Sequence, residues 1–441
     1  MKSGNYTFPS PELLEGHENV RLSDSVGIEV ANDHQAVVPL KVMLADDAFI
    51  GSKAELPVAM GVDIFNKVKV FDLADAPHLL IAGASNQGKT VGINAIITSL
   101  LYAKYPSELK FVLIDPKMVE FTRYSKLLKH YLAVMPDASD GQEEMDNAIV
   151  KQPKQAEEIL QSLCIEMDER YRLLNSAETG NIKEYNAKYK TGLLRPDDGH
   201  HFLPYIVVVI DEYADLTIPW GISLKSKGIA KNIMSAIIRL AQKGRAAGIH
   251  IIIATQRPSD DVITGLIKTN FPTRIAFRVS TRTDSITILN SPGAEHLNGK
   301  GDMLYSVGKE MERMQCAYIT LDEISKIVDF IAAQTESAEG PYILPKPHNE
   351  ANEDEKKASV PVTEFDPLFE EVAEYVVKRA EVSVSDLQRK FAVGYLRGCR
   401  IMEQLESVGI VNPEARIDSK HSVIVKGKKE LAKILSGINS Q

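Results

Sequence analysis

A phosphate-binding loop is the stretch of this 441-residue sequence with the clearest chemistry. Residues 83–90 read GASNQGKT, that is, a glycine, four residues and then Gly-Lys-Thr. Glycines let backbone N–H groups close around an anion, the lysine reaches the outer phosphates of a nucleotide, and the threonine can bind Mg²⁺. We therefore predict a nucleotide site formed by Gly83, Ala84, Ser85, Asn86, Gln87, Gly88, Lys89 and Thr90. Asparagine tolerates a left-handed backbone, which the loop can require at position 86.

Such a loop needs a carboxylate site for Mg²⁺ and water, and two strand ends compete for it. Asp115 ends the run FVLID and is followed by proline, whereas Asp211 ends YIVVVID and is followed by Glu212. An aspartate at a strand end can hold Mg²⁺ through water, and an adjacent glutamate can orient and deprotonate the attacking water. Because the second pair supplies both groups, we assign Asp211 to the metal and Glu212 to catalysis.

A third polar strand end is found in IIIATQRP. We predict that Gln256, two residues before Pro258, senses the γ-phosphate or the attacking water. The alternative is that Gln256 lies in an ordinary turn at the strand exit.

Short apolar strands must position these groups. HLLIAG, KFVLID, YIVVVID and IHIIIAT are near-continuous and rich in β-branched residues, which is typical of parallel strands covered on both faces. Residues 90–104 and 156–174 between them carry apolar residues at helical spacing. We predict an α/β domain with a parallel sheet over residues 76–333. A small mixed α/β subdomain is expected over residues 1–75, in which AVVPLKVML reads as a strand.

The C-terminal part differs in composition. Residues 334–363 contain few core-forming residues, several prolines and an acidic cluster, so we predict a flexible linker. Residues 364–441 resume a compact pattern of short helices, followed by the strand-turn-strand candidate ARIDSKHSVIV, in an order that resembles a winged helix.

Composition narrows the class of protein. The net charge of −9 excludes a global positive field, so any surface that binds nucleic acid must be local. Three separated cysteines predict neither a disulfide framework nor a zinc site, and no apolar run is long enough to span a bilayer. We expect the chain to be cytoplasmic.

Several blocks together resemble FtsK/SpoIIIE-type DNA translocases. They are GASNQGKT, FVLIDPKMVEF, YIVVVIDEYADL, the long block LAQKGRAAGIHIIIATQRPSDDVITGLIKTNFPTRIAFRVS, and GDMLY. The resemblance implies a RecA-like P-loop ATPase that uses ATP and Mg²⁺ and assembles as a homo-hexameric ring around double-stranded DNA. It also implies an N-terminal membrane region, absent from this chain, through which the motor would associate with a membrane.

A ring motor needs an arginine that acts on the neighbouring subunit's ATP. We predict Arg274 or Arg282 for this role, with Arg245 and Arg257 as alternatives. The family has DSRTIL where this chain has DSITIL, so Ile286 replaces an expected arginine. If that arginine is the finger, hydrolysis in this chain is weakened unless Arg282 substitutes for it.

The tail RKFAVGYLRGCRIMEQLESVGIV resembles the helix-turn-helix of the family's γ domain. Residues 389–433 hold ten Lys/Arg and five Asp/Glu, a local charge of +5. We predict DNA-phosphate contacts from Arg397, Arg400, Lys420, Lys426 and Lys428. The resemblance also implies a XerD-type recombinase as a partner. Leu396 stands in place of the family's base-reading asparagine, so the target sequence does not transfer.

These observations predict an ATP-dependent double-stranded DNA translocase acting in chromosome segregation, cell division or DNA transfer. Two alternatives stay open: a protein-export ATPase of the same fold, and a weakly hydrolysing DNA-binding paralogue.

Overall fold

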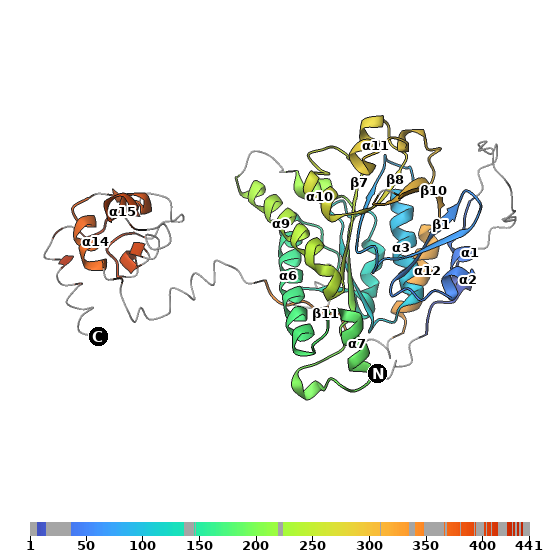
Figure 1. Ribbon diagram of the computed structural model, residues 1–441, viewed down its shortest axis with the longest axis horizontal. Helices are drawn as coiled ribbons and strands as arrows, with labels where there is room; N and C mark the ends of the chain where they lie inside the picture. The colour runs from blue at the N-terminus through green and yellow to red at the C-terminus, as the bar shows by residue number, and fades with distance from the viewer. Residues whose placement is uncertain are drawn as a thin grey trace. The chain divides into compact units, whose positions relative to one another are not determined.

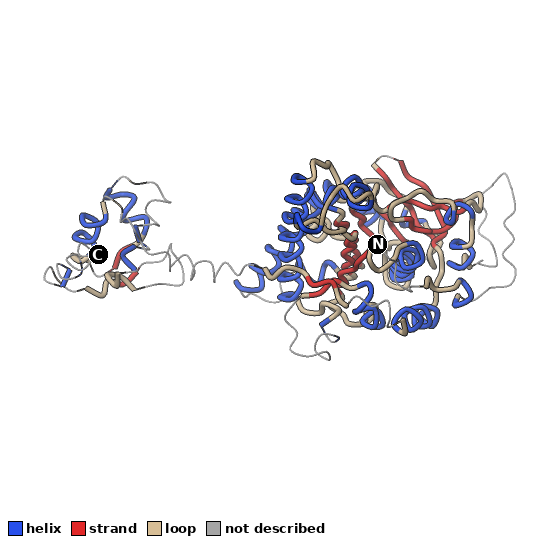
Figure 2. Tube along the Cα trace, turned by 90° about the horizontal axis from the view of Figure 1, so that it is seen from below, coloured by secondary structure: helices blue, strands red, loops and turns tan. Residues whose placement is uncertain are grey.

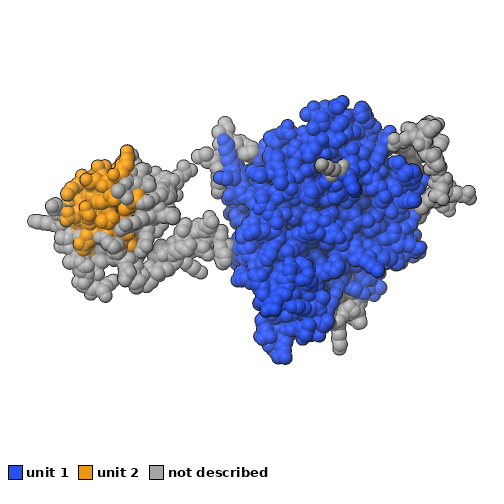
Figure 3. All heavy atoms as spheres, in the orientation of Figure 1, with its two compact units in different colours: residues 1–347 blue, residues 348–441 orange. Residues whose placement is uncertain are grey.

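The structure is a computed structural model that divides into two compact units, residues 1–347 and 348–441 (Figure 3). It describes residues 7–14, 37–135, 145, 147–218, 224–308, 310–334, 340–347, 366, 368–379, 381–391, 393, 401–402, 404–406, 408–412, 421–425, 427, 430–431 and 434. In this described part, no helix combines the length and the apolar composition that crossing a bilayer requires.

One sheet forms the frame of the first unit. Among the described residues it has nine strands, in the order β2 (Val68–Asp72), β1 (Pro57–Asp63), β10 (Glu310–Cys316), β9 (Asp302–Val307), β8 (Thr273–Phe277), β3 (His78–Ala82), β7 (Ile249–Thr255), β6 (Tyr205–Ile210) and β4 (Leu109–Ile114). Neighbours from β8 to β4 pair in parallel, and those from β2 to β8 pair antiparallel. The four strands predicted from apolar runs are therefore confirmed, and an antiparallel half extends their sheet.

Helices cover both faces of the sheet because adjacent residues of each parallel strand point in opposite directions. Leu79 and Ile81 of β3 join the core that contains α3 (Lys89–Ala103) and α12 (Leu321–Ala332), whereas Leu80 and Ala82 join the core that contains α6 (Pro153–Ser176) and α9 (Leu224–Ala247). Figure 1 shows these two helix layers on either side of the strands, and Figure 2 shows the same layers from below. Both faces are buried, which explains why the strand sequences are apolar without alternation.

Shorter helices complete the first unit: α1 (Leu40–Leu44), α2 (Asp47–Ile50), α4 (Leu128–Tyr131), α7 (Ile182–Lys190), α8 (Tyr213–Thr217), α10 (Gly265–Asn270) and α11 (Arg282–Leu289). The strand expected in AVVPLKVML is wrong. Leu40, Met43 and Leu44 are buried at helical spacing, so this segment places one helical face on the core instead of alternating two faces of a strand. The predicted boundary between a small subdomain and the ATPase domain at residue 75 stays a prediction. In the structure, β1 and β2, which precede this boundary, belong to the same sheet as the ATPase strands.

Two short segments cover the outer edge of β4. Phe111 forms a parallel bridge with Leu132, and Ile114 forms another with Val150. The Asp115 N–H donates to the Val150 carbonyl at 2.8 Å, and the Val150 N–H donates to the Leu113 carbonyl at 2.9 Å. The backbone of this edge is therefore largely hydrogen-bonded within the chain.

Residues 340–347, which fall in the expected linker, pack on the first unit. The strand β11 (Tyr342–Ile343) pairs with β5 (Ala133–Val134), and Leu344 is fully buried. The Tyr342 hydroxyl donates to Glu166 Oε1 at 2.6 Å. The linker prediction is therefore wrong for residues 340–347. Their composition is that of a linker, but Leu344 and Tyr342 attach the segment to the first unit.

The second unit has its own core. The helices α14 (Phe369–Val376) and α15 (Val384–Phe391) contribute Phe369, Val372 and Leu387 to it, and Leu405 and Val425 complete it. The short strands β12 (Glu381–Val382) and β13 (His421–Ser422) pair antiparallel, as a wing requires. The remaining part of the predicted strand-turn-strand, residues 415–420, lies outside the described residues.

Candidate functional site

The loop that joins β3 to α3 has the backbone of a phosphate-binding loop. Asn86 adopts φ 61°, as predicted, and Gly88 adopts φ 120°. A Cβ atom at Gly88 would lie 2.8 Å from the Cα of Gly301, and one at Gly83 would lie 2.7 Å from the Cβ of Phe277. Both glycines are required because neighbouring chain segments approach them too closely for a side chain.

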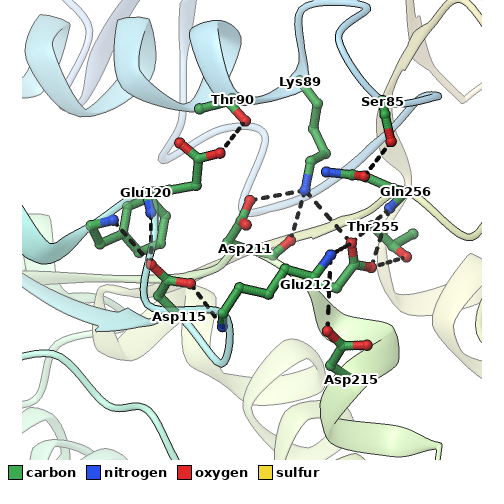
Figure 4. Close-up of polar contacts among 12 residues, drawn as sticks. Ser85, Lys89, Thr90, Asp115, Glu120, Asp211, Glu212, Asp215, Thr255 and Gln256 are labelled. Atoms are coloured by element: carbon green, nitrogen blue, oxygen red, sulfur yellow. Dashed lines mark hydrogen bonds and ion pairs between the residues drawn. The ribbon is translucent and has the colours of Figure 1, made fainter. Parts of the chain in front are cut away.

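Lys89 lies between this loop and the end of β6. Its Nζ is 2.9 Å from Asp211 Oδ1, 3.1 Å from the Asp211 carbonyl oxygen and 4.0 Å from Glu212 Oε2 (Figure 4). All three side chains are buried. Burial raises the pKa of Asp211, although the ammonium of Lys89 acts against this shift. The structure thus brings together the lysine and the two carboxylates that the sequence placed 122 positions apart or more.

The end of β7 joins the same cluster. The Thr255 hydroxyl donates to Glu212 Oε1 at 2.6 Å, and the Gln256 N–H donates to it at 3.2 Å. The side-chain oxygen of Gln256 accepts a hydrogen bond from Ser85 Oγ at 2.6 Å. Gln256 therefore contacts both the phosphate-binding loop and the catalytic glutamate candidate, which is the position that a γ-phosphate sensor needs.

Asp115, the competing carboxylate, is committed to its own loop. It is fully buried, and its two oxygens accept the backbone N–H groups of Lys117, Met118, Glu120 and Phe121 at 2.9–3.1 Å. These four bonds fix the path of residues 115–121 after β4. Asp115 therefore anchors a loop, which favours Asp211 for the metal role.

Two further side chains of that loop, neither of them among the predicted site residues, enter the site. Glu120 Oε1 accepts a hydrogen bond from Thr90 Oγ1 at 3.0 Å, and Lys117 Nζ is 3.0 Å from Glu212 Oε2. Burial raises the pKa of Glu120, and the charges of Asp211 and Asp115 add to the effect. Both residues stand in the block FVLIDPKMVEF, but their spacing alone does not separate them from solvent-exposed loop charges.

A cleft opens over these groups. It is lined by the phosphate-binding loop, by residues 62–67 at the turn between β1 and β2, and by residues 313–322 leading into α12. Thr90, Glu120 and Asp211 line it together and offer hard oxygen donors, which suit Mg²⁺ shared with a nucleotide's phosphates.

The two predicted arginine-finger candidates differ in their surroundings. The guanidinium of Arg274 is buried and donates to the carbonyl oxygens of Phe271 at 3.0 Å, Ile288 at 3.1 Å and Lys268 at 2.6 Å. Burial lowers its pKa. Arg274 is thus held by contacts within its own chain, which favours the exposed Arg282 for reaching a neighbour.

Arg282 is exposed at the first turn of α11, and among the described residues we find no ion pair for it. Ile286 lies one turn later on the same helix with 43% of its surface exposed. Arg245 forms an ion pair with Asp75 at 3.2 Å, and Arg257 is exposed next to Gln256. Arg245, Arg257 and Arg282 are thus the exposed candidates of the four, and Arg245 shares a surface ion pair with Asp75.

The predicted DNA contacts cannot be placed. Arg397, Arg400, Lys420, Lys426 and Lys428 lie outside the described residues, as does Leu396.

Each of the two units is similar to a known protein family or domain. The profile of the FtsK/SpoIIIE family matches residues 39–260, and that of the Ftsk gamma domain matches residues 363–425. The chain is 42% identical over 419 residues to the DNA translocase FtsK of Chlorobaculum tepidum, covering 94% of this chain and 49% of the relative. It is 42% identical over 410 residues to the DNA translocase FtsK of Haemophilus influenzae, covering 88% and 72%. The chain thus spans about half the length of the first of these relatives.

Solved structures share the fold of much of this chain. The pCW3 conjugation coupling protein TcpA, solved as a monomer with ATPgS, is 27% identical with a TM-score of 0.55, covering 71% of this chain and 81% of TcpA. The type VII secretion ATPase EccC of Thermomonospora curvata is 21% identical with a TM-score of 0.53, covering 71% of this chain and 35% of EccC. With a nucleotide-binding loop and carboxylates placed at one edge of this sheet, and with both family profiles matched in order, the chain belongs to the FtsK/SpoIIIE family.

Proposed function

We propose that this chain is the ATP-hydrolysing motor of a double-stranded DNA translocase that acts in chromosome segregation, cell division or DNA transfer. The observation that carries the proposal is the ion pair of Lys89 with Asp211, flanked by Thr90, Glu212 and Gln256 at the carboxyl ends of adjacent strands. The relatives named DNA translocase and the gamma-domain match support duplex DNA as the partner.

Each site residue has a separate role in the proposed binding and hydrolysis of ATP. Lys89 exchanges its bond with Asp211 for the outer phosphates of ATP, and the backbone N–H groups of residues 83–90 hold the phosphate chain. Thr90 and Asp211 would hold Mg²⁺, which would supply positive charge against the phosphates. Glu212 orients and deprotonates the attacking water, and Gln256 reports on the γ-phosphate.

The decisive experiment measures steady-state ATP hydrolysis with and without linear duplex DNA. We expect stimulation by DNA, and loss of turnover by at least about 100-fold in Lys89→Ala, because a charged contact to the transferred group is removed. Lys183→Ala is the matched control, since Lys183 forms an ion pair of 3.0 Å with Glu55 away from the cleft. A rate of ATP hydrolysis that does not change when duplex DNA is added would instead favour a protein-export ATPase.

We further propose a homo-hexameric ring in which Arg282 reaches the neighbour's ATP. A finger of this kind contributes about 10³–10⁵ in rate. Arg282→Ala should therefore lower turnover without lowering the melting temperature. Subunit mixing with Lys89→Ala should restore part of the activity only if the arginine acts between subunits. Mass measurement with a slowly hydrolysed ATP analogue tests the ring size.

A weakly hydrolysing paralogue is the second candidate, and the exposed Ile286 one turn after Arg282 is the observation that favours it. If an arginine is needed at this place, Ile286→Arg raises turnover. An unchanged or lower rate in that variant would remove this candidate.

For the second unit we propose DNA binding through Arg397, Arg400, Lys420, Lys426 and Lys428, and contact with a XerD-type recombinase. Replacing these five residues with glutamine should weaken duplex binding and reduce its salt dependence, since each phosphate contact contributes about one counterion. Co-purification of the recombinase with the intact chain, compared with the five-residue variant, tests the partner. We propose that this motor is membrane-associated in the cell.

A further inference from the structure

The loop of residues 115–121 reaches the ATP site from the outer strand β4. It is held at one end by the four hydrogen bonds to Asp115. Met118 within it adopts φ 58°, a left-handed conformation that costs a methionine energy. A loop that keeps such a conformation is held by its contacts, and two of those contacts are with site residues.

Glu212 is buried and is held by three donor groups: the Thr255 hydroxyl, the Gln256 N–H and the Lys117 ammonium. A carboxylate offers about four acceptor positions. Here Oε1 accepts from the Thr255 hydroxyl and shares the single Gln256 N–H with Oε2, at 3.2 and 3.3 Å. Oε2 also lies 3.0 Å from Lys117 Nζ and 4.0 Å from Lys89 Nζ. The carboxylate has no exposed surface, so a water can bind it only where one of these partners leaves.

Lys117 is the partner best able to leave. Its side chain is 38% exposed and sits on a flexible four-carbon stem, whereas Thr255 and Gln256 are fixed by the end of the buried strand β7. Asp215, 3.9 Å from Lys117 Nζ, offers a second carboxylate toward which the ammonium can move (Figure 4). Lys117 therefore has room to move between the two carboxylates, whereas Glu212 is held in place by Thr255 and Gln256.

We propose that Lys117 is a positioning residue that occupies the water-binding side of Glu212 and restrains hydrolysis until it moves away. This inference rests on the proposed role of Glu212 in ATP hydrolysis. With Lys117 in place, its ammonium competes with the attacking water for Oε2 of Glu212. When Lys117 moves toward Asp215, that acceptor position opens, and the remaining bonds to Thr255 and Gln256 keep the carboxylate oriented.

The test compares Lys117→Met, which keeps the length of the stem and removes the charge, with Lys117→Arg, which keeps the charge. We expect Lys117→Met to raise the DNA-independent kcat several-fold, with KM for ATP changed less than two-fold, and to shrink the stimulation by DNA. Lys117→Arg should keep the low DNA-independent kcat of the wild type. Lys183→Met serves as the control for loss of an exposed ion pair of the same length.

Binding of a fluorescent ATP analogue gives a readout that does not depend on turnover. Affinity in Lys117→Met should match the wild type, since Lys117 is proposed to touch Glu212 and not the phosphates. A higher KM and weaker analogue binding in Lys117→Met would identify Lys117 as a phosphate ligand and overturn the proposal. An unchanged basal kcat with unchanged affinity would also overturn it, whereas absence of Lys89-dependent hydrolysis in the wild type would overturn the proposed function itself.

Discussion

Gly88 shows how closely single residues of the phosphate-binding loop are constrained. Its φ of 120° and the 2.8 Å approach of Gly301 leave no room for a Cβ atom. We expect Gly88→Ala to weaken nucleotide binding by more than ten-fold, because the loop must shift to relieve the clash. Gly228, an exposed glycine within α9 with no atom near its Cβ direction, is the control. Gly228→Ala should stabilise the protein by about 0.5–1 kcal/mol, and nucleotide titration together with urea unfolding measures both.

Arg274 carries a prediction about stability at the same scale. Its three hydrogen bonds to carbonyl oxygens connect β8 with α10 and α11. Arg274→Met leaves those carbonyls without their donor, so we expect a loss of about 1–3 kcal/mol of unfolding free energy. The exposed Arg282→Met should stay within about 0.5 kcal/mol of the wild type. Equal stability of the two variants in urea would show that the Arg274 contacts are dispensable.

The sequence could identify the residues whose type alone restricts their role. The loop from Gly83 to Thr90 and the pair Asp211–Glu212 follow from chemistry and spacing. Lys117 and Glu120 could not be found in this way, because their role depends on Asp115 folding the loop back toward the site. The hydrogen bonds of Asp115, which favour Asp211 for the metal role, are not revealed by spacing.

At the scale of elements, the parallel strands were predictable because burial on both faces leaves a continuous apolar run. The antiparallel strand β10 was not, since its residues Glu310–Cys316 are mostly polar and only partly buried. The helix α1 was mistaken for a strand because five residues are too few to establish a period. The strand β11 was hidden in a segment with the composition of a linker.

The docking of β11 predicts local protection of the C-terminal end of the first unit. The N–H groups of Tyr342 and Leu344 donate to the carbonyls of Leu132 and Val134 at 3.0 and 2.9 Å. Leu344→Ala should speed hydrogen exchange at these two amides, because the buried leucine holds the strand in place. Ile343 is half exposed on the other face, so Ile343→Ala should change exchange little. Equal rates in the two variants would mean that Leu344 does not hold the strand.

At the scale of the whole molecule, two buried histidines make stability depend on pH. His78 and His250 lie on neighbouring strands, and burial lowers their pKa values from 6.5 to about 3 and about 4. Each Nε2 atom is buried without a hydrogen-bond partner among the described residues. Below pH 6.5 these two histidines become protonated in the unfolded chain but stay neutral in the folded chain. The free energy of unfolding that they contribute is therefore fully present above pH 6.5 and decreases as the pH falls toward about 4.

Urea unfolding at pH 7.5 and pH 5.0 measures this dependence. His250→Gln should reduce the loss of stability at the lower pH, because one of the two buried imidazoles is removed. The exposed His296 serves as the control, and His296→Gln should leave the loss unchanged. A pH dependence that is the same in all three proteins would show that the buried pair is not its source.

The covered edge of β4 constrains how copies of this protein can meet. Bridges from Leu132 and Val150 already occupy the backbone groups that an incoming strand would use. Strand addition at this side is therefore blocked, which guards against uncontrolled growth of fibrils. Any oligomer formed here must rely on matching side-chain surfaces, so its subunits can separate and re-engage without exchanging main-chain hydrogen bonds at this edge.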